Sequence, residues 1–295
     1  MSTATDRAPE TGAAAGWGGP AGRRRRWLPA HPASLLSRWL VLLAVAVVWQ
    51  LVAQRRQSVF FPPMTEILGE ARRSWLSGPA SSAFLSPAVA DDVLPSLARL
   101  LAGWLLAVVG GVLLGTAIGL IRNLADYLNP AIEFLRAIPP PALIPIFLVI
   151  FGLGSDREVA LIAVGVVWPI LLNTIDGVRS VDPTLIDTGR AFRTGRLRRL
   201  TLIVLPSALP RIFAGLRISL SLALILMVIS ELVAATNGIG RTILDAERNF
   251  AFTKMWAVIL LLGVLGYVLN ALLLWAERHL LAWHRGPRAA AGEGP

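Results

Sequence analysis

The sequence predicts an all-α membrane protein, a polytopic bundle of transmembrane helices. Hydrophobic residues make up 55% of the 295 residues, and charged residues make up only 16%. The mean hydropathy is +0.64. In a typical soluble domain, by contrast, roughly a quarter of the residues are charged. The apolar residues also gather into stretches of about twenty, the length that crosses the hydrocarbon core of a bilayer. These observations exclude an ordinary soluble enzyme.

The N-terminal segment, residues 1–34, is rich in Ala, Gly, Pro and Arg and has no apolar periodicity. Such a segment cannot bury a core, so we expect a disordered tail. Its run Arg23-Arg24-Arg25-Arg26 is interpreted as a topology determinant that lies against anionic lipid. The net charge is +10, which could indicate nucleic-acid binding. The arginines instead flank the apolar stretches, as the positive-inside rule for membrane proteins expects.

Six transmembrane helices are predicted after this tail. They cover residues 35–53, 100–121, 138–154, 159–175, 212–235 and 256–275. The third contains four prolines near its start (Pro139, Pro140, Pro141 and Pro145), and these must break or kink it, which is tolerated only inside a bundle. The predicted domains are the tail, a first span with its outer loop (35–92), a core (93–278) with a long loop at 176–211, and a C-terminal tail (279–295).

Arginine placement predicts the orientation of these spans. Arginines concentrate in the N-terminal tail, in the loops after the second and fourth spans, and at the C-terminus. Because cytoplasmic loops carry an excess of Lys and Arg, these segments and both termini are expected on the cytoplasmic side of the membrane. Four arginines between the first two spans oppose this orientation: Arg55, Arg56, Arg72 and Arg73.

Two spans carry residues that stand out. The second places small residues four positions apart (Gly103, Ala107, Gly111, Gly115 and Gly119), which predicts tight packing against a neighbouring helix. The fifth contains Arg217 and Glu231, and at 14 positions apart they fall within about 40° of one helix face, with Ser221 beside them. These three residues are interpreted either as one wall of a translocation path or as groups bonded to neighbouring helices.

The loop at 176–211 is the most informative segment of the chain. Asp182 followed by Pro183 predicts a helix start, and Gly195 is expected to end that helix. A second, basic helix is predicted from Arg196 until Pro206 stops it. The segment is either a lipid-surface helix or a docking element for a cytoplasmic partner.

This loop resembles the coupling motif of ATP-binding-cassette (ABC) importer permeases. In that family, Glu-Ala-Ala is followed by Gly six positions after the Glu, by Ile at sixteen, and by Leu-Pro at eighteen and nineteen. With Asp187 at the Glu position, Ile203 and Leu205-Pro206 fall in place, while Arg193 stands at the glycine position. The stretches FFPPMTEIL (60–68), SLARLLAG (96–103) and ELVAATNGIG (231–240) extend the likeness to the nitrate, sulfonate, taurine and bicarbonate branch.

The resemblance implies a type I ABC importer transmembrane domain in a bacterial inner membrane. Its expected partners are two cytoplasmic ATPase subunits, an extracytoplasmic substrate-binding protein and a second copy of the chain. It also implies that a coupling helix passes ATPase closure to the bundle, with alternating access to the two membrane faces. The implied coupling residues are Asp187, Gly189, Arg190, Phe192 and Gly195.

Neither a cofactor nor enzymatic activity is expected of the chain itself. A nucleotide-binding loop needs a lysine between a glycine and a Ser or Thr, and Lys254, the only lysine, lies between Thr253 and Met255. The alternatives are a self-sufficient secondary transporter or channel, and a membrane-embedded enzyme. The first normally has internal repeats, and the second needs paired carboxylates or an activated nucleophile at membrane depth; neither is evident in the sequence.

Overall fold

A computed structural model describes residues 32–79 and 84–281, except for the side chains of residues 32–39 and 122. Residues 1–31 and 282–295, which hold most of the two predicted tails, lie outside the described residues. The chain divides into two units at Val48, within α1 (Pro32–Arg56). The other helices belong to the second unit: α2 (Met64–Trp75), α3 (Leu94–Leu120), α4 (Arg122–Ala137), α5 (Ile144–Phe151), α6 (Ser155–Arg179), α7 (Pro183–Ala191), α8 (Arg196–Arg199), α9 (Leu205–Ala234), α10 (Ile239–Arg248) and α11 (Phe252–Leu280).

Four helical stretches among the described residues are long and apolar enough to cross a membrane. They are Val89–Leu120, Ser155–Arg179, Arg196–Ala234 and Phe252–Leu280. They coincide with the second, fourth, fifth and sixth predicted spans, which are therefore confirmed as candidate spans. The first predicted span lies within α1, which is helical throughout but is not one of these four.

The third predicted span is broken near its start, as its prolines predict, but the predicted bounds 138–154 cover only half of the element. The chain instead forms α4, a short 3₁₀ turn (Pro140–Leu143) and the eight-residue α5. The two halves of this pair, Asn123–Ala137 and Pro140–Phe151, meet at a bend of 80°. Residues 122–137, which the sequence assigned to a loop, thus belong to the pair. Consecutive prolines at the bend cannot continue the backbone ladder of α4, so the helix breaks there.

The glycines of α3 pack against α6, as the sequence predicts. A Cβ at Gly103 would lie 2.8 Å from the Cβ of Ile162, and one at Gly119 would lie 2.8 Å from the Cβ of Val178. Each of these glycines meets the residue 59 positions further along the chain, so α3 and α6 run parallel and in register. The segment between them must therefore return along the whole bundle, and the bent pair α4–α5 makes this return.

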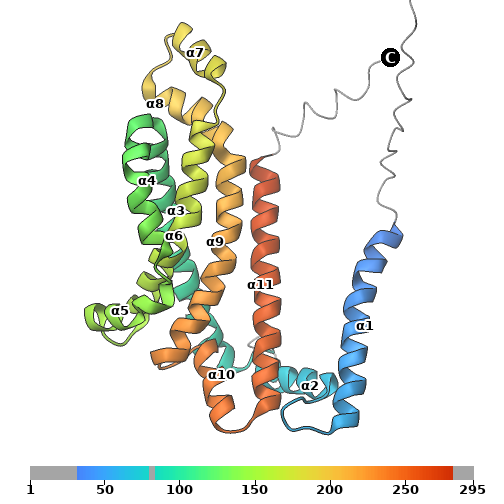
Figure 1. The fold of residues 1–295 in the computed structure, drawn as a ribbon. Helices are drawn as coiled ribbons and strands as arrows, with labels where there is room; N and C mark the ends of the chain where they lie inside the picture. The colour runs from blue at the N-terminus through green and yellow to red at the C-terminus, as the bar shows by residue number, and fades with distance from the viewer. Residues whose placement is uncertain (1–31, 80–83, 282–295) are drawn as a thin grey trace, which may run out of the picture. The chain divides into compact units, whose positions relative to one another are not determined.

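Helix α9 packs against a neighbouring face of α6 in the antiparallel direction and also contacts α3. Near one end Gly177 approaches the backbone oxygen of Ala208, and near the other Gly165 meets Leu226. Helices α7 and α8, between α6 and α9 in the chain, lie at one end of this unit, whereas α10, between α9 and α11, lies at the opposite end (Figure 1). The core is the apolar seam shared by α3, α6 and α9.

Candidate functional site

The start of α7 is built as the sequence predicts. Asp182 is the N-cap, and its Oδ1 accepts a hydrogen bond of 2.8 Å from the backbone N–H of Thr184. This backbone hydrogen bond holds the pKa of the Asp182 carboxyl below its usual range. Pro183 occupies the first turn, where no intrahelical donor is needed. The cap fixes where the helix begins.

The end of α7 differs from the prediction. The helix ends at Ala191, with Phe192 as its C-cap, and the left-handed residue is Arg193, whose φ is 52°. The N–H of Thr194 donates to the carbonyl of Gly189 at 2.9 Å, which closes the helix in a Schellman-type turn. Gly195 does not end α7 but precedes α8 as its N-cap, with an ordinary φ of −58°.

Pro206 does not stop the second helix of the loop either. A π-helical turn, Leu200–Val204, joins α8 to α9, and Pro206 lies in the first turn of α9. The π-helical turn interrupts the regular i→i−4 hydrogen bonding just before Pro206, so the stretch can accommodate a residue that has no N–H. The predicted short basic helix is therefore the beginning of a continuous helical stretch, Arg196–Ala234, so α7 is attached directly to a membrane-spanning element.

The five predicted coupling residues have different surroundings. Asp187 and Arg190 form an exposed ion pair with an N–O distance of 2.9 Å, and Phe192 is 81% exposed although it is a large apolar residue. Gly189 is buried, and a Cβ there would lie 2.8 Å from Cδ1 of Ile203 in the same chain. Helix α7 thus carries an exposed charged pair and ends at an exposed apolar C-cap residue, while Gly189 packs on the π-helical turn.

Two of the three predicted path residues lie together. Arg217 and Ser221 line a half-open groove of about 340 Å³ between α9 and α11, with Leu220, Leu224, Tyr267 and Asn270 among the other lining residues. Arg217 forms an ion pair with Glu277 of α11, and its side chain is 45% exposed. The groove combines apolar walls with one guanidinium and three uncharged polar side chains.

Glu231, the third of these residues, lies elsewhere and is fully buried. Its carboxylate accepts hydrogen bonds from Ser96 Oγ at 2.7 Å, from Arg99 at 3.0 Å and from the backbone N–H of Gly240 at 2.8 Å. These partners come from α3 and from the first turn of α10. The carboxylate therefore ties three helices together and also provides negative charge at the positive end of α10.

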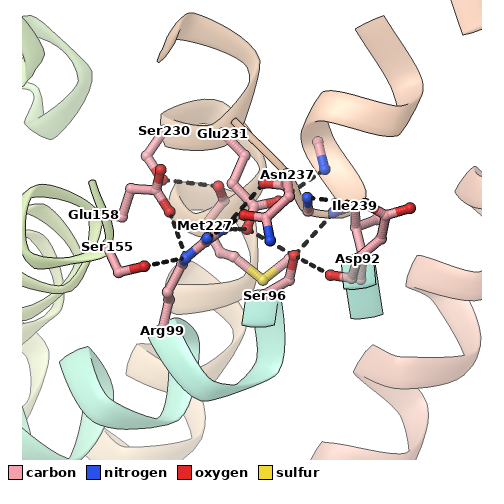
Figure 2. Close-up of polar contacts among 12 residues, drawn as sticks. Asp92, Ser96, Arg99, Ser155, Glu158, Met227, Ser230, Glu231, Asn237 and Ile239 are labelled. Carbon is pink, nitrogen blue, oxygen red and sulfur yellow. Dashed lines mark hydrogen bonds and ion pairs between the residues drawn. The ribbon is translucent and has the colours of Figure 1, made fainter. Parts of the chain in front are cut away.

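Arg99 is the centre of this cluster (Figure 2). Its guanidinium forms ion pairs of 3.0 Å with both Glu231 of α9 and Glu158 of α6. It also donates to Ser155 Oγ at 2.9 Å and to the carbonyl oxygen of Asn237 at 3.1 Å, and it bonds the Asn237 side chain. Only 8% of its side chain is exposed. One side chain thus connects α3, α6, α9 and the segment that leads into α10.

A second buried arginine completes the cluster. Arg157 is 1% exposed, and its guanidinium pairs with Glu158 at 3.0 Å. The two arginines balance Glu158 and Glu231, as buried charges require. Sequence reasoning missed Arg99, Arg157 and Glu158. The stretches SLARLLAG and ELVAATNGIG contain most of the remaining residues of this cluster. Their family likeness is the feature of the sequence that could have indicated the cluster.

The comparisons with known proteins agree with this geometry. Residues 107–282 match the family described as the binding-protein-dependent transport system inner membrane component. TauC of Escherichia coli, a taurine transport system permease, is 30% identical over 82% of this chain and 88% of its own length. CmpB of Synechococcus elongatus, a bicarbonate transport system permease, is 31% identical over 81% of this chain and 87% of its own. Among solved structures, a chain of the inward-facing MetNI methionine ABC transporter superimposes with a TM-score of 0.55 at 21% identity, covering 64% of this chain and 94% of that one.

Proposed function

Since the chain belongs to the family of binding-protein-dependent transport system inner membrane components, an ABC importer permease family whose ATPase is a separate subunit, we propose that it forms the transmembrane path for a small anion. The class of solute is inferred from relatives about 30% identical, which include transporters of taurine, bicarbonate and nitrate. A sulfonate, taurine, nitrate or bicarbonate is therefore the expected cargo.

The observation that carries this proposal is the exposed surface of α7. Phe192, the C-cap of α7, is an apolar residue that is 81% exposed, and the same helix carries the exposed Asp187–Arg190 pair. A large exposed apolar residue with a polar rim is typical of a protein–protein contact. Phe192 is the proposed anchor in a groove of the ATPase, and Arg190 and Asp187 are the proposed polar contacts. Gly189 and Gly195 act within the loop, by packing and by starting α8.

The membrane arrangement follows from this assignment. We take α1 and the bent pair α4–α5 as spans in addition to the four apolar stretches, which gives six, and two copies of the chain in the assembly. The end with α7 faces the cytoplasm, together with both termini, and the end with α10 faces the substrate-binding protein. The even number of spans and the seven arginines in the loop at 176–211 support this orientation.

The groove between α9 and α11 is the proposed part of the translocation path. Arg217 provides a positive charge, and Ser221 and Asn270 provide hydrogen bonds, whereas the leucines would contact an alkyl group. Charged residues inside spans are costly and generally mark transport pathways or helix contacts. Glu231, which is fully buried with protein partners, is assigned to holding the helices together and not to the wall of the path.

Purification of the tagged chain from its native membrane tests the function. We expect an ABC ATPase to co-purify, and we expect its loss when residues 187–195 are replaced by a Gly/Ser linker. The substitution Tyr127→Ala, at an exposed aromatic residue of α4, serves as the control and should retain the ATPase. Vesicles that take up solute without ATP or any partner would instead make the chain a secondary transporter, and would refute the proposal.

Uptake by the reconstituted complex tests the cargo. Labelled taurine, an alkanesulfonate, nitrate and bicarbonate are offered with the cognate binding protein and ATP inside the vesicles. ATP-dependent accumulation of one of these four solutes, each of which carries a sulfonate or another oxyanion group, is expected. Accumulation of an uncharged solute or a cation alone would leave the permease assignment in place and refute the anion.

A further inference from the structure

We infer that Arg99 is a positioning residue that joins α10 rigidly to the block of α3, α6 and α9, so that movement of α7 at one end reaches α10 at the other. The inference rests on the proposed function, because it needs an ATPase at α7. It assigns a role to a cluster that the transport path does not use. The partner it concerns is the protein that contacts the exposed end of α10, residues 247–250.

The first argument is the way the start of α10 is held. Only residues 235–238 separate α9 from α10, and Arg99 bonds both the carbonyl oxygen and the side chain of Asn237. From the other side, Asp92 Oδ1 accepts from the N–H of Gly238 at 3.2 Å, and Ser96 Oγ accepts from that of Ile239 at 2.9 Å. The connection is therefore bonded to α3 and to Asp92 in a second π-helical turn, Val89–Val93, which precedes α3; it is not a loose hinge.

Close packing at Gly238 points the same way. This residue has a φ of 120°, which favours glycine, and a Cβ there would lie 2.6 Å from the Glu231 carboxylate. A Cβ at Gly240 would lie 2.7 Å from the Cβ of Glu231 and from the backbone oxygen of Val228. The backbone of α10 thus rests directly on α9, so α10 cannot tilt independently without breaking the bonds to Glu231.

The third argument is the stiffness of the elements between the two ends. Helices α3 and α6 approach each other closely from Gly103 to Gly119, and α6 and α9 do so at Gly177 and Gly215, where an added Cβ would lie 3.0 Å and 2.8 Å from a backbone oxygen of the other helix. Packed cores have discrete arrangements and do not deform continuously. Helix α7 follows α6 through residues 180–182 and connects through α8 to α9, so a displacement of α7 moves the block as one body.

The ion pairs make Arg99 the joint of this body. Glu158 of α6 and Glu231 of α9 both lie 3.0 Å from the same guanidinium, and all three side chains are at least nine-tenths buried. Breaking one contact would leave a buried charge without its partner, which is expensive in a low-dielectric interior. The helices are therefore held together at this end while the α7 end responds to the ATPase.

The experiment uses the assembled complex with its ATPase. The chain has no cysteine, so a single cysteine at Arg248, at the exposed end of α10, carries a spin label. In the parent complex, ATP with vanadate is expected to change the label spectrum. In Asn237→Ala, which removes the side-chain bonds to Arg99 and to the backbone oxygen of Asp91 but leaves the buried charges and the backbone bonds in place, the nucleotide-induced change should become smaller without disappearing.

Three controls separate the possible outcomes. Asn249→Ala, at the far end of α10, removes a hydrogen bond to Asp245 and should leave the change intact. Arg99→Lys should retain part of the change, and Arg99→Gln should lose it while the ATPase stays bound and hydrolyses ATP at its basal rate. If the label responds equally in Asn237→Ala and in the parent complex, the joint is refuted and the importer function stands. If no ATPase binds the parent chain, the proposed function itself fails.

Discussion

Arg193 adopts the left-handed backbone conformation at the end of α7, and Gly195, two residues later, does not. The φ angles are 52° and −58°. ABC importer permeases have a glycine at the position of Arg193. The structure explains this preference, because the Schellman-type turn needs a positive φ at this residue. A non-glycine residue there carries roughly 1–2 kcal/mol of backbone strain.

Replacing Arg193 by glycine should therefore stabilise α7. The relief of strain exceeds the entropy that glycine loses on folding, so we expect a net gain of about 1 kcal/mol. Hydrogen exchange at the amide of Thr194, which donates to Gly189, should become about fivefold slower. Gly195→Ala is the matched control and should change little, because its φ is ordinary and nothing lies within 4 Å of a Cβ. Faster exchange in Arg193→Gly would contradict the argument.

The cap of α7 should make the loop sensitive to acid. The pKa of Asp182 is lowered by the backbone hydrogen bond from Thr184, so its stabilisation is fully present above the unfolded pKa of about 3.9 and is lost as the pH falls through the lower folded value. Exchange of the amides of α7 should accelerate in that range. Asp182→Ala should remove this dependence and open the helix at neutral pH, while Asp182→Asn should keep the helix closed without the pH dependence. A pH profile shared by all three proteins would sink this assignment.

Local sequence patterns predict the parts of this fold that depend on local chemistry. Hydropathy places four spans because an apolar stretch of that length must be buried or lie in lipid, and Asp182-Pro183 places the start of α7. The prolines predict the break before α5, but hydropathy does not show that residues 122–137 form the other half of a bent pair, because α4 is much less apolar than the spans. The end of α7 was assigned to Gly195 because glycine is the usual left-handed residue, whereas the fold places Arg193 there.

The buried charge cluster is not visible in any local window. Arg99 and Glu158 each lie one residue before a predicted span, where a charged residue is ordinarily at the membrane interface. Their burial depends on partners more than fifty positions away in the chain, such as Ser155 for Arg99. Arg217 and Glu231 were singled out because they lie inside a span, but periodicity alone does not distinguish a residue at a groove from one bonded to neighbouring helices.

The glycine stripe gives a test of the helix packing. A Cβ at Gly115 would lie 2.7 Å from the Cβ of Thr174 and 2.8 Å from the backbone oxygen of Leu171. Since backbone cannot give way cheaply, Gly115→Ala should destabilise the α3–α6 pair by roughly 1–3 kcal/mol. Gly110→Ala, where nothing lies within 4 Å, should be neutral or slightly stabilising. Thermal unfolding in detergent measures both, and equal losses would show that α3 and α6 do not pack as described.

The proposed anchor of α7, Phe192, can be tested by changing the volume of its side chain. Phe192→Ala should weaken ATPase binding by about 2 kcal/mol, the scale of an interface hot spot, and leave the thermal stability of the isolated permease unchanged. Phe192→Leu should restore most of the binding because it restores apolar volume. Co-purification yield and titration of the detergent-solubilised permease with the ATPase measure the effect. Undiminished binding by the alanine variant would remove Phe192 from the interface.

The pair formed by Arg217 and Glu277 predicts different effects of two neutralising substitutions. Arg217→Gln removes the positive charge of the groove, so uptake of an anion at saturating loaded binding protein should slow by about fivefold, or about 1 kcal/mol for a half-exposed charge. Glu277→Gln frees the guanidinium of Arg217 and should not slow uptake. The double variant tests whether Glu277 affects uptake only through Arg217. If it does, the uptake rate of the double variant should match that of Arg217→Gln. Equal slowing by both single substitutions, with equal losses of thermal stability, would mean that the pair only holds α9 against α11 and that the groove is not part of the path.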